Sequence, residues 1–222
     1  MRTPGAPHES AIDALYEQMS AGIGCWAVDS FGRRRRLPAG RWLGGSASTP
    51  ADRFADEVVV GACTEPTLDL GCGPGRFTAA LTRRGIPALG VDLSAVAVEM
   101  TTRRGGFALR GDAFAPLPGR GGWGRVLLAD GNIGIGGDPV RILRRARELL
   151  TPAGLVIAEV DPAQSGFRTE HVRWESDHIV GAWHSWSRVG SDAVGGFAAA
   201  AGLRLIDSIV VSGRSFTAMC IA

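Results

Sequence analysis

The 222-residue sequence contains no lysine, so arginine supplies all 24 of its basic side chains. Together with 22 acidic residues these give a net charge of +2, which is too small to indicate a polyanionic partner. No apolar run approaches the roughly 18 residues of a membrane-spanning helix, and none follows the N-terminal arginine as in a signal peptide. We therefore expect no membrane partner and a cytoplasmic location.

Cysteine and histidine are also scarce, with four of each. The cysteines have no CxxC spacing and fall below the density of a disulfide scaffold, so we interpret them as reduced thiols. No HxH or HxxxH pair occurs, and in a helix His171 and His178 would lie roughly 10.5 Å apart along the axis. We therefore expect no metal site.

The apolar fraction of 45% and the charged fraction of 21% are typical of a globular protein of one domain. From about residue 66, short apolar runs alternate with helical patterns, which predicts a parallel sheet covered by helices. The capping residues Thr49, Ser94 and Asp138 predict helices that end near residues 63, 104 and 150. The predicted strands are residues 67–70, 88–91, 107–110, 125–129, 154–160, 203–211 and 216–221.

The last two predicted strands are separated by only a few residues, which is too short for a crossover helix. The strand over 216–221 must therefore return antiparallel. The prediction is an α/β fold, a three-layer sandwich with a seven-stranded, mostly parallel sheet whose last strand is antiparallel, plus a small N-terminal cap. A plain dinucleotide dehydrogenase, whose parallel order continues by crossovers, is disfavoured.

Two segments do not follow this alternation. We interpret residues 1–48 as a cap or lid segment, and residues 162–188 as a substrate-side insertion in the main domain over 49–222. Both are rich in aromatic residues, which we expect to flank a ligand cleft: Tyr16, Trp26 and Trp42 in the first, and Trp174, Trp183 and Trp186 in the second. The four arginines over 33–36 are typical of a solvated loop, although they could also bind a phosphate, a carboxylate or a nucleic acid.

The most specific motif is TLDLGCGPGR, residues 67–76. It places Asp69 in a strand directly before a turn in which glycine allows a ligand to approach the backbone closely. The spacing is GxGxG, and Arg76 takes the position of the third glycine of a dinucleotide fingerprint. The three glycines are Gly71, Gly73 and Gly75. This motif resembles the first motif of class I methyltransferases that depend on S-adenosylmethionine (SAM).

The resemblance extends over about residues 49–222 and implies a cofactor site for SAM. In that family the glycine loop cradles the amino acid and ribose parts of the cofactor, with Asp69 adding polar contacts. The other matching positions follow the next three strands, at the strand ends where open α/β sheets bind ligands. They are Asp92 and Leu93 at the ribose, Asp112 and Ala113 at the adenine, and Asp130 and Asn132 at the methionine end.

The resemblance also implies transfer of a methyl group, which we expect to reach a small-molecule acceptor by in-line displacement. An oxygen or nitrogen acceptor usually needs a base for its proton. The candidates in the insertion are His184, His178 and Glu175, with His184 first because Trp183 and Trp186 flank it. Residues 130–133 read DGNI without the proline-rich motif of the nucleic-acid enzymes that methylate exocyclic base amines, which disfavours that subclass and leaves RNA enzymes with other signatures open. With the small net charge, we expect a nucleic-acid acceptor less than a small molecule.

Three other functions remain open at this point. A methyltransferase acting on protein would differ mainly in its acceptor, and the sequence has no extra domain or large charged face to recruit one. A nicotinamide-dependent oxidoreductase could use Asp92 as its ribose-binding acid, and a non-catalytic binding protein could have the same fold. Neither the acceptor atom nor the oligomeric state follows from the sequence.

Overall fold

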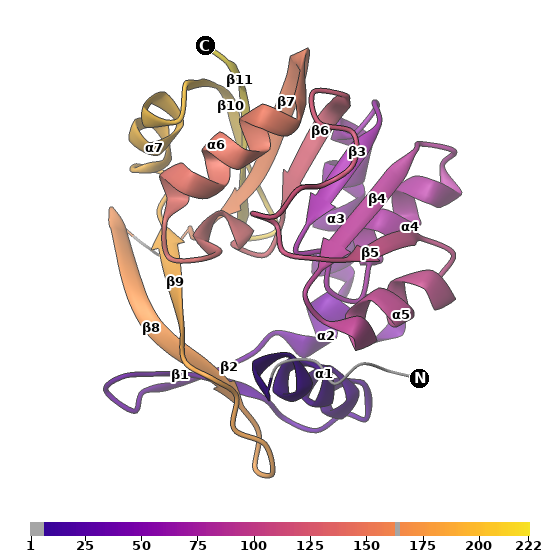
Figure 1. The fold of residues 1–222 in the computed structure, drawn as a ribbon, viewed down its shortest axis with the longest axis vertical. Coiled ribbons are helices and arrows are strands. Elements are labelled where there is room, and N and C mark those ends of the chain that lie inside the picture. Colours follow the sequence, from indigo (N-terminus) through magenta and orange to yellow (C-terminus); the bar gives the residue numbers. More distant parts are fainter. Residues whose placement is uncertain (1–6, 163–164) are drawn as a thin grey trace.

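The computed structural model describes residues 7–162 and 165–222, with a seven-stranded sheet at its centre (Figure 1). Strand β11 is antiparallel to both of its neighbours, and the other adjacent strands are parallel. The predicted fold class is therefore confirmed. From one edge to the other the strands are β10 (Leu203–Val211), β11 (Arg214–Ile221), β7 (Leu150–Val160), β6 (Trp123–Leu128), β3 (Thr67–Leu70), β4 (Ala88–Asp92) and β5 (Phe107–Arg110).

Helices cover both faces of this sheet because neighbouring residues of a strand point to opposite faces. In β6, Val126 and Leu128 are buried with residues of α6 and α7, whereas Leu127 is buried with residues of α3 and α4. Helix α5 packs along β4 and β5. The helices are α3 (Pro50–Ala62), α4 (Arg76–Arg83), α5 (Ala95–Arg103), α6 (Pro139–Leu149) and α7 (Val194–Ala200).

The three predicted capping residues begin α3, α5 and α6, each accepting a hydrogen bond from the backbone N–H three residues later. The helix predicted to reach residue 150 ends at Leu149 instead. Strand β7 begins directly at Leu150 because this residue already pairs with Trp123 of β6. The boundary between α6 and β7 is therefore decided by pairing with a strand that is distant in sequence, and the local sequence pattern carries no information about that pairing.

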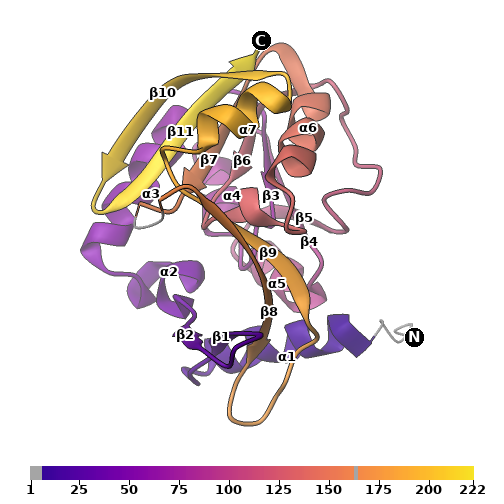
Figure 2. The ribbon, with the colours of Figure 1, turned by 90° about the vertical axis from the view of Figure 1, so that its left-hand side faces the viewer.

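A second, four-stranded antiparallel sheet lies below the first in Figure 1 and is formed by both segments that the alternation left unexplained. Figure 2 shows β8 and β9 as a long hairpin that runs from the main sheet down to β1. We call the whole four-stranded sheet the small sheet. Its order is β2 (Arg34–Arg36), β1 (Trp26–Asp29), β8 (Phe167–Glu175) and β9 (His184–Val189).

The structure corrects the interpretation of the arginine run as a loop. Residues 34–36 form the edge strand β2, paired with residues 26–28 of β1. Consecutive charged side chains are tolerated there because an edge strand has one free side, where charges also discourage pairing with another chain.

The small sheet is attached to the main domain through β9 and the helical turn η2 (Asn132–Gly134). A Cβ atom on Gly134 would lie 1.9 Å from the backbone oxygen of Ser187, so only glycine allows this approach. The Ser187 hydroxyl also donates to the oxygen of Gly137, at 2.9 Å. Strand β9 is therefore held against the chain that follows β6.

The remaining N-terminal elements pack between the small sheet and α5. They are α1 (Pro7–Ser20) and α2 (Ala39–Leu43), and the turn η1 (Gly45–Ala47) contacts α2. Asp13 of α1 accepts hydrogen bonds from the Ser94 hydroxyl, at 2.6 Å, and from the Val96 N–H, at 3.1 Å. Helix α1 is thus tied to the first turn of α5. In the described ranges, no helix has the length and apolar character needed to cross a bilayer.

Candidate functional site

The glycine-rich turn between β3 and α4 adopts a backbone that other residues resist. Gly71, Gly73 and Gly75 have φ angles of 73°, 53° and 77°. A Cβ on Gly75 would lie 2.2 Å from Oγ1 of Thr101, so this glycine lets α5 pack against the turn. The Asn132 amide donates to the backbone oxygens of Leu70 and Gly71, both at 2.9 Å. These contacts hold the turn between α5 and η2.

A cavity of about 370 Å³ opens at the carboxyl ends of β3, β4 and β5, and we call it the first cavity. Its volume falls within the usual range of small-molecule sites, roughly 300–1,000 Å³. The structure therefore brings together most of the residues predicted to bind a cofactor. Those that line the cavity are Gly71, Asp92, Leu93, Asp112, Ala113 and Asn132.

Asp92 is held by the backbone on both sides. Its two carboxylate oxygens accept hydrogen bonds from the Gly73 N–H, at 2.8 Å, and the Ser94 N–H, at 2.9 Å. Burial raises the pKa of Asp92, because it disfavours the charged form. A carboxylate has roughly four acceptor sites, so about two remain for the hydroxyls of a ligand in the first cavity.

The other predicted cofactor residues lie outside the lining of the first cavity. Asp69 is buried on the α4 face of β3, where the Thr78 hydroxyl donates to it at 2.9 Å. Burial raises its pKa to about 7. Gly73 and Gly75 shape the turn behind the cavity wall. Asp69 therefore connects β3 to α4 and does not line the first cavity, and its direct contact with a cofactor stays a prediction.

Several residues of the first cavity were not singled out as cofactor residues. Ile12 and Tyr16 of α1 line it from the N-terminal segment, and Phe114, Ile135 and Arg141 line it from the main domain. The Arg141 guanidinium lies over the Phe114 ring, 3.9 Å from its centroid. Helix α1 is far in sequence from the other residues that line the first cavity. In the sequence, only the aromatic content of residues 1–48 indicates that this segment contributes to a ligand cleft.

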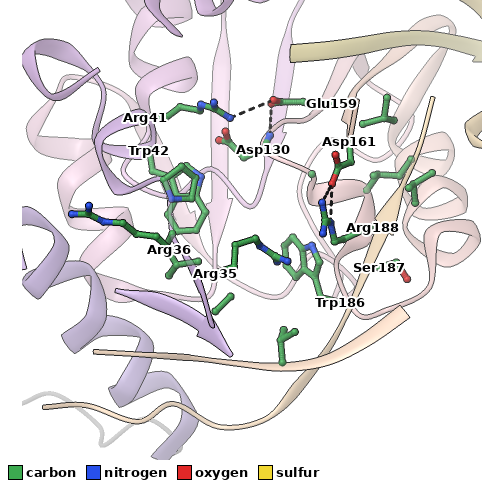
Figure 3. A pocket seen from close by; sticks show the side chains of 18 of the residues that line it. Arg35, Arg36, Arg41, Trp42, Asp130, Glu159, Asp161, Trp186, Ser187 and Arg188 are labelled. Carbon is green, nitrogen blue, oxygen red and sulfur yellow. Dashed lines mark hydrogen bonds and ion pairs between the residues drawn. The ribbon is translucent and has the colours of Figure 1, made fainter. Parts of the chain in front are cut away.

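A second cavity of about 330 Å³ lies between the small sheet and the ends of β6 and β7 (Figure 3). Trp174 and Trp186 line both cavities and so form a shared wall, while Trp42 lines only the second. The rings of Trp42 and Trp174 are 5.2 Å apart. The aromatic residues of the cap and the insertion therefore meet here. Trp26 and Trp183, also expected at the cleft, line neither cavity.

The floor of the second cavity contains carboxylates that are already paired. Asp130, with a φ of 53°, receives two hydrogen bonds from Arg76, at 2.6 and 3.0 Å. Glu159 receives two from Arg214, both at 2.8 Å, and one from the backbone N–H of Asp130, at 2.7 Å. Asp130 therefore faces the second cavity and not the first, and its charge is balanced by a buried guanidinium.

Of the predicted proton acceptors, only His184 lines a cavity. It lies in the first, with its ring centroid 5.9 Å from that of Trp174 and 6.3 Å from that of Trp186. His178 is exposed, and Glu175 pairs with Arg34 and Arg173. Neither of them lines a cavity. Within the described part of the chain, no group of three or more histidine, cysteine or acidic residues is arranged to hold a metal ion.

Comparison with known proteins agrees with this geometry. Residues 67–154 match the family model described as a methyltransferase domain. No protein of curated function matches the sequence.

Solved structures extend the likeness to the whole chain. A SAM-dependent methyltransferase from Bacteroides fragilis, in complex with S-adenosylhomocysteine, is 16% identical with a TM-score of 0.79, covering 100% of this chain and 98% of its own. The 1,6-didemethyltoxoflavin-N1-methyltransferase of Burkholderia thailandensis is 18% identical with a TM-score of 0.59, covering 99% and 92%. A sugar N-methyltransferase from a Streptoalloteichus species is 15% identical with a TM-score of 0.58, covering 99% and 96%. The solved structures confirm the fold, and the family model confirms that residues 67–154 resemble a methyltransferase domain.

Proposed function

We propose that this chain, whose residues 67–154 match the methyltransferase domain, is a SAM-dependent methyltransferase that acts on a small molecule. The observation that carries the proposal is the first cavity, where residues from four separate strand ends converge at the glycine-rich turn. The similar structures from Bacteroides fragilis and Burkholderia thailandensis both contain the product S-adenosylhomocysteine.

The residues of the first cavity fit such a cofactor. The acceptor-only carboxylate of Asp92 suits the two hydroxyls of a ribose, and Leu93 and Phe114 supply apolar surface for an adenine beside the acceptor Asp112. At Gly71 any side chain would collide with the Asn132 amide, at 2.7 Å, so the backbone stays open to a ligand. When bound, SAM supplies an electrophilic methyl group on a positively charged sulfur.

The acceptor is proposed to occupy the second cavity, which adjoins the first along Trp174 and Trp186. Its volume of about 330 Å³ fits a small molecule. The similar enzymes from Burkholderia thailandensis and Streptoalloteichus are named for toxoflavin and sugar N-methylation. In-line transfer depends mainly on positioning, so walls that hold both partners contribute much of the rate.

Calorimetric titration of SAM and S-adenosylhomocysteine tests the cofactor. Asp92→Asn should weaken binding by about 1–3 kcal/mol, because it removes a charged acceptor from the site. Asp207→Asn, an exposed carboxylate on β10, is the matched control and should leave the affinity unchanged. Failure of the folded wild-type protein to bind either compound would refute the proposal.

The same titration with NAD and NADP tests the oxidoreductase alternative. Binding of a nicotinamide cofactor in preference to SAM would support it. A protein that binds SAM but forms no S-adenosylhomocysteine with any acceptor would support the non-catalytic alternative.

His184 is the proposed proton acceptor because, of the three candidates, it alone lies beside Trp174 and Trp186, where the two cavities adjoin. With an acceptor found by screening for S-adenosylhomocysteine release, His184→Gln should lower kcat by roughly 10²-fold or more. His171→Gln, an exposed histidine on the neighbouring strand β8, should keep kcat. An unchanged kcat in His184→Gln, measured at saturating SAM, would remove the assignment.

A further inference from the structure

We propose that the acceptor is a planar ring with an acidic substituent, carboxylate or phosphate, and that Arg35 binds this acid in the second cavity. The inference rests on the proposed function, since it names the acceptor class of the same site.

Strand β2 directs Arg35 toward the cavity and Arg34 away from it. Arg35 pairs in register with Ala27, which lines the second cavity. Adjacent residues of a strand point to opposite faces, and Arg34 accordingly lies over the Trp26 ring, 4.3 Å from its centroid. Figure 3 shows the Arg35 side chain extending toward Trp186.

Arg35 retains hydrogen-bonding capacity for a ligand. Its carboxylate contact is with Glu170, at 3.7 Å, which exceeds the usual length of a hydrogen bond. Glu170 is held more closely by Arg168. A guanidinium carries five N–H donors in a planar fork that matches carboxylate and phosphate oxygens.

The other charged groups around the cavity are largely neutralised by one another. Asp130 and Glu159 on the floor are paired with the buried arginines of the main domain. Arg41 pairs with Asp52 at 2.7 Å, and Arg188 pairs with Asp161. Arg36 also lines the cavity, but Figure 3 shows its side chain extending away from Trp186. Arg35 thus points into the cavity with its carboxylate partner beyond hydrogen-bond length, and an anionic ligand can approach it without meeting an unbalanced carboxylate on the floor.

The ring follows from the walls of the cavity. Trp42, Trp174 and Trp186 line the second cavity, and Arg35 extends toward Trp186 (Figure 3). Flat aromatic surfaces favour planar ligands, which bury a large area and stack with offset faces or edges. The combination of this aromatic wall with the guanidinium of Arg35 selects a planar acid.

Ligand-observed NMR titration of the protein without cofactor tests the inference directly. The probes are benzoate, phenyl phosphate, uncharged benzamide and the ringless acid acetate. Benzoate or phenyl phosphate should bind the wild type about tenfold more tightly than benzamide or acetate, since both the charge and the ring contribute. Arg35→Gln should abolish the preference for the acid, while Arg34→Gln, on the same strand and 46% exposed against 50%, should retain it.

Equal binding of benzoate and benzamide, or an acid preference that survives Arg35→Gln, would overturn the inference. So would a matching loss of SAM affinity in Arg35→Gln, which would assign this arginine to the cofactor. Calorimetry with SAM on the same variants separates the two proposals. Failure of the wild type to bind SAM would refute the proposed function. A wild type that binds SAM but binds benzoate no more tightly than benzamide would refute only this inference.

Discussion

The pH dependence of stability should carry a distinct contribution from Asp69. This carboxyl group lies within β3 with 1% of its surface exposed. Burial raises its pKa from an ordinary value of 3.8 to about 7, while the hydrogen bond from Thr78 opposes the shift. In the unfolded chain the group returns to a pKa of roughly 3.9.

The sign follows from proton binding. Between pH 4 and pH 7 the folded protein keeps a proton on Asp69 that the unfolded chain has released, so the free energy of unfolding falls as the pH rises. A shift of about three pKa units corresponds to about 4 kcal/mol in total, of which about 2.5 kcal/mol is lost between pH 5 and pH 8. Above both pKa values the loss is complete and constant.

Asp69→Asn removes this titration and keeps an oxygen that accepts from the Thr78 hydroxyl. Urea denaturation at pH 5 and pH 8 gives the change in unfolding free energy for each protein, and the other titrating groups cancel in the difference. The wild type should lose about 2.5 kcal/mol more than Asp69→Asn. Asp207→Asn, at an exposed position, should behave as the wild type does. Equal losses in the wild type and Asp69→Asn would show that the pKa of Asp69 is not raised.

Two further substitutions test how the candidate site is held together. Gly75→Ala should reduce the free energy of unfolding by several kcal/mol, because its methyl group would lie 2.2 Å from the Thr101 hydroxyl in addition to the cost of a positive φ. Gly85 has a similar φ of 74°, but a Cβ there would meet no other atom, so Gly85→Ala should reduce the free energy of unfolding by only about 1–2 kcal/mol. Equal reductions for the two variants in urea denaturation would contradict the clash at Gly75. Asp13→Ala removes the acceptor for the Ser94 hydroxyl, so the amides of α1 should exchange their hydrogens faster while those of α6 stay protected. Unchanged exchange in α1 would show that this contact does not anchor the helix.

The sequence determined the main sheet and most of the first cavity. Asp92, Asp112 and Asn132 follow separate strands, and the carboxyl ends of neighbouring parallel strands meet at one edge of a sheet. Once the strands, their direction and their order in the sheet are known, these residues come together at one edge. The antiparallel β11 follows similarly, since a short connection permits only a hairpin.

Only the tertiary structure decided the acceptor side. Strands β1 and β8 pair although more than 130 residues separate them, and no local pattern specifies which distant strand an edge will meet. That pairing brings Trp42 beside Trp174 and turns Arg35 toward the second cavity. It also leaves His178 and Glu175 outside both cavities. Local motifs thus determined where a cofactor is expected to bind, whereas long-range strand pairing and packing decided which side chains face the second cavity.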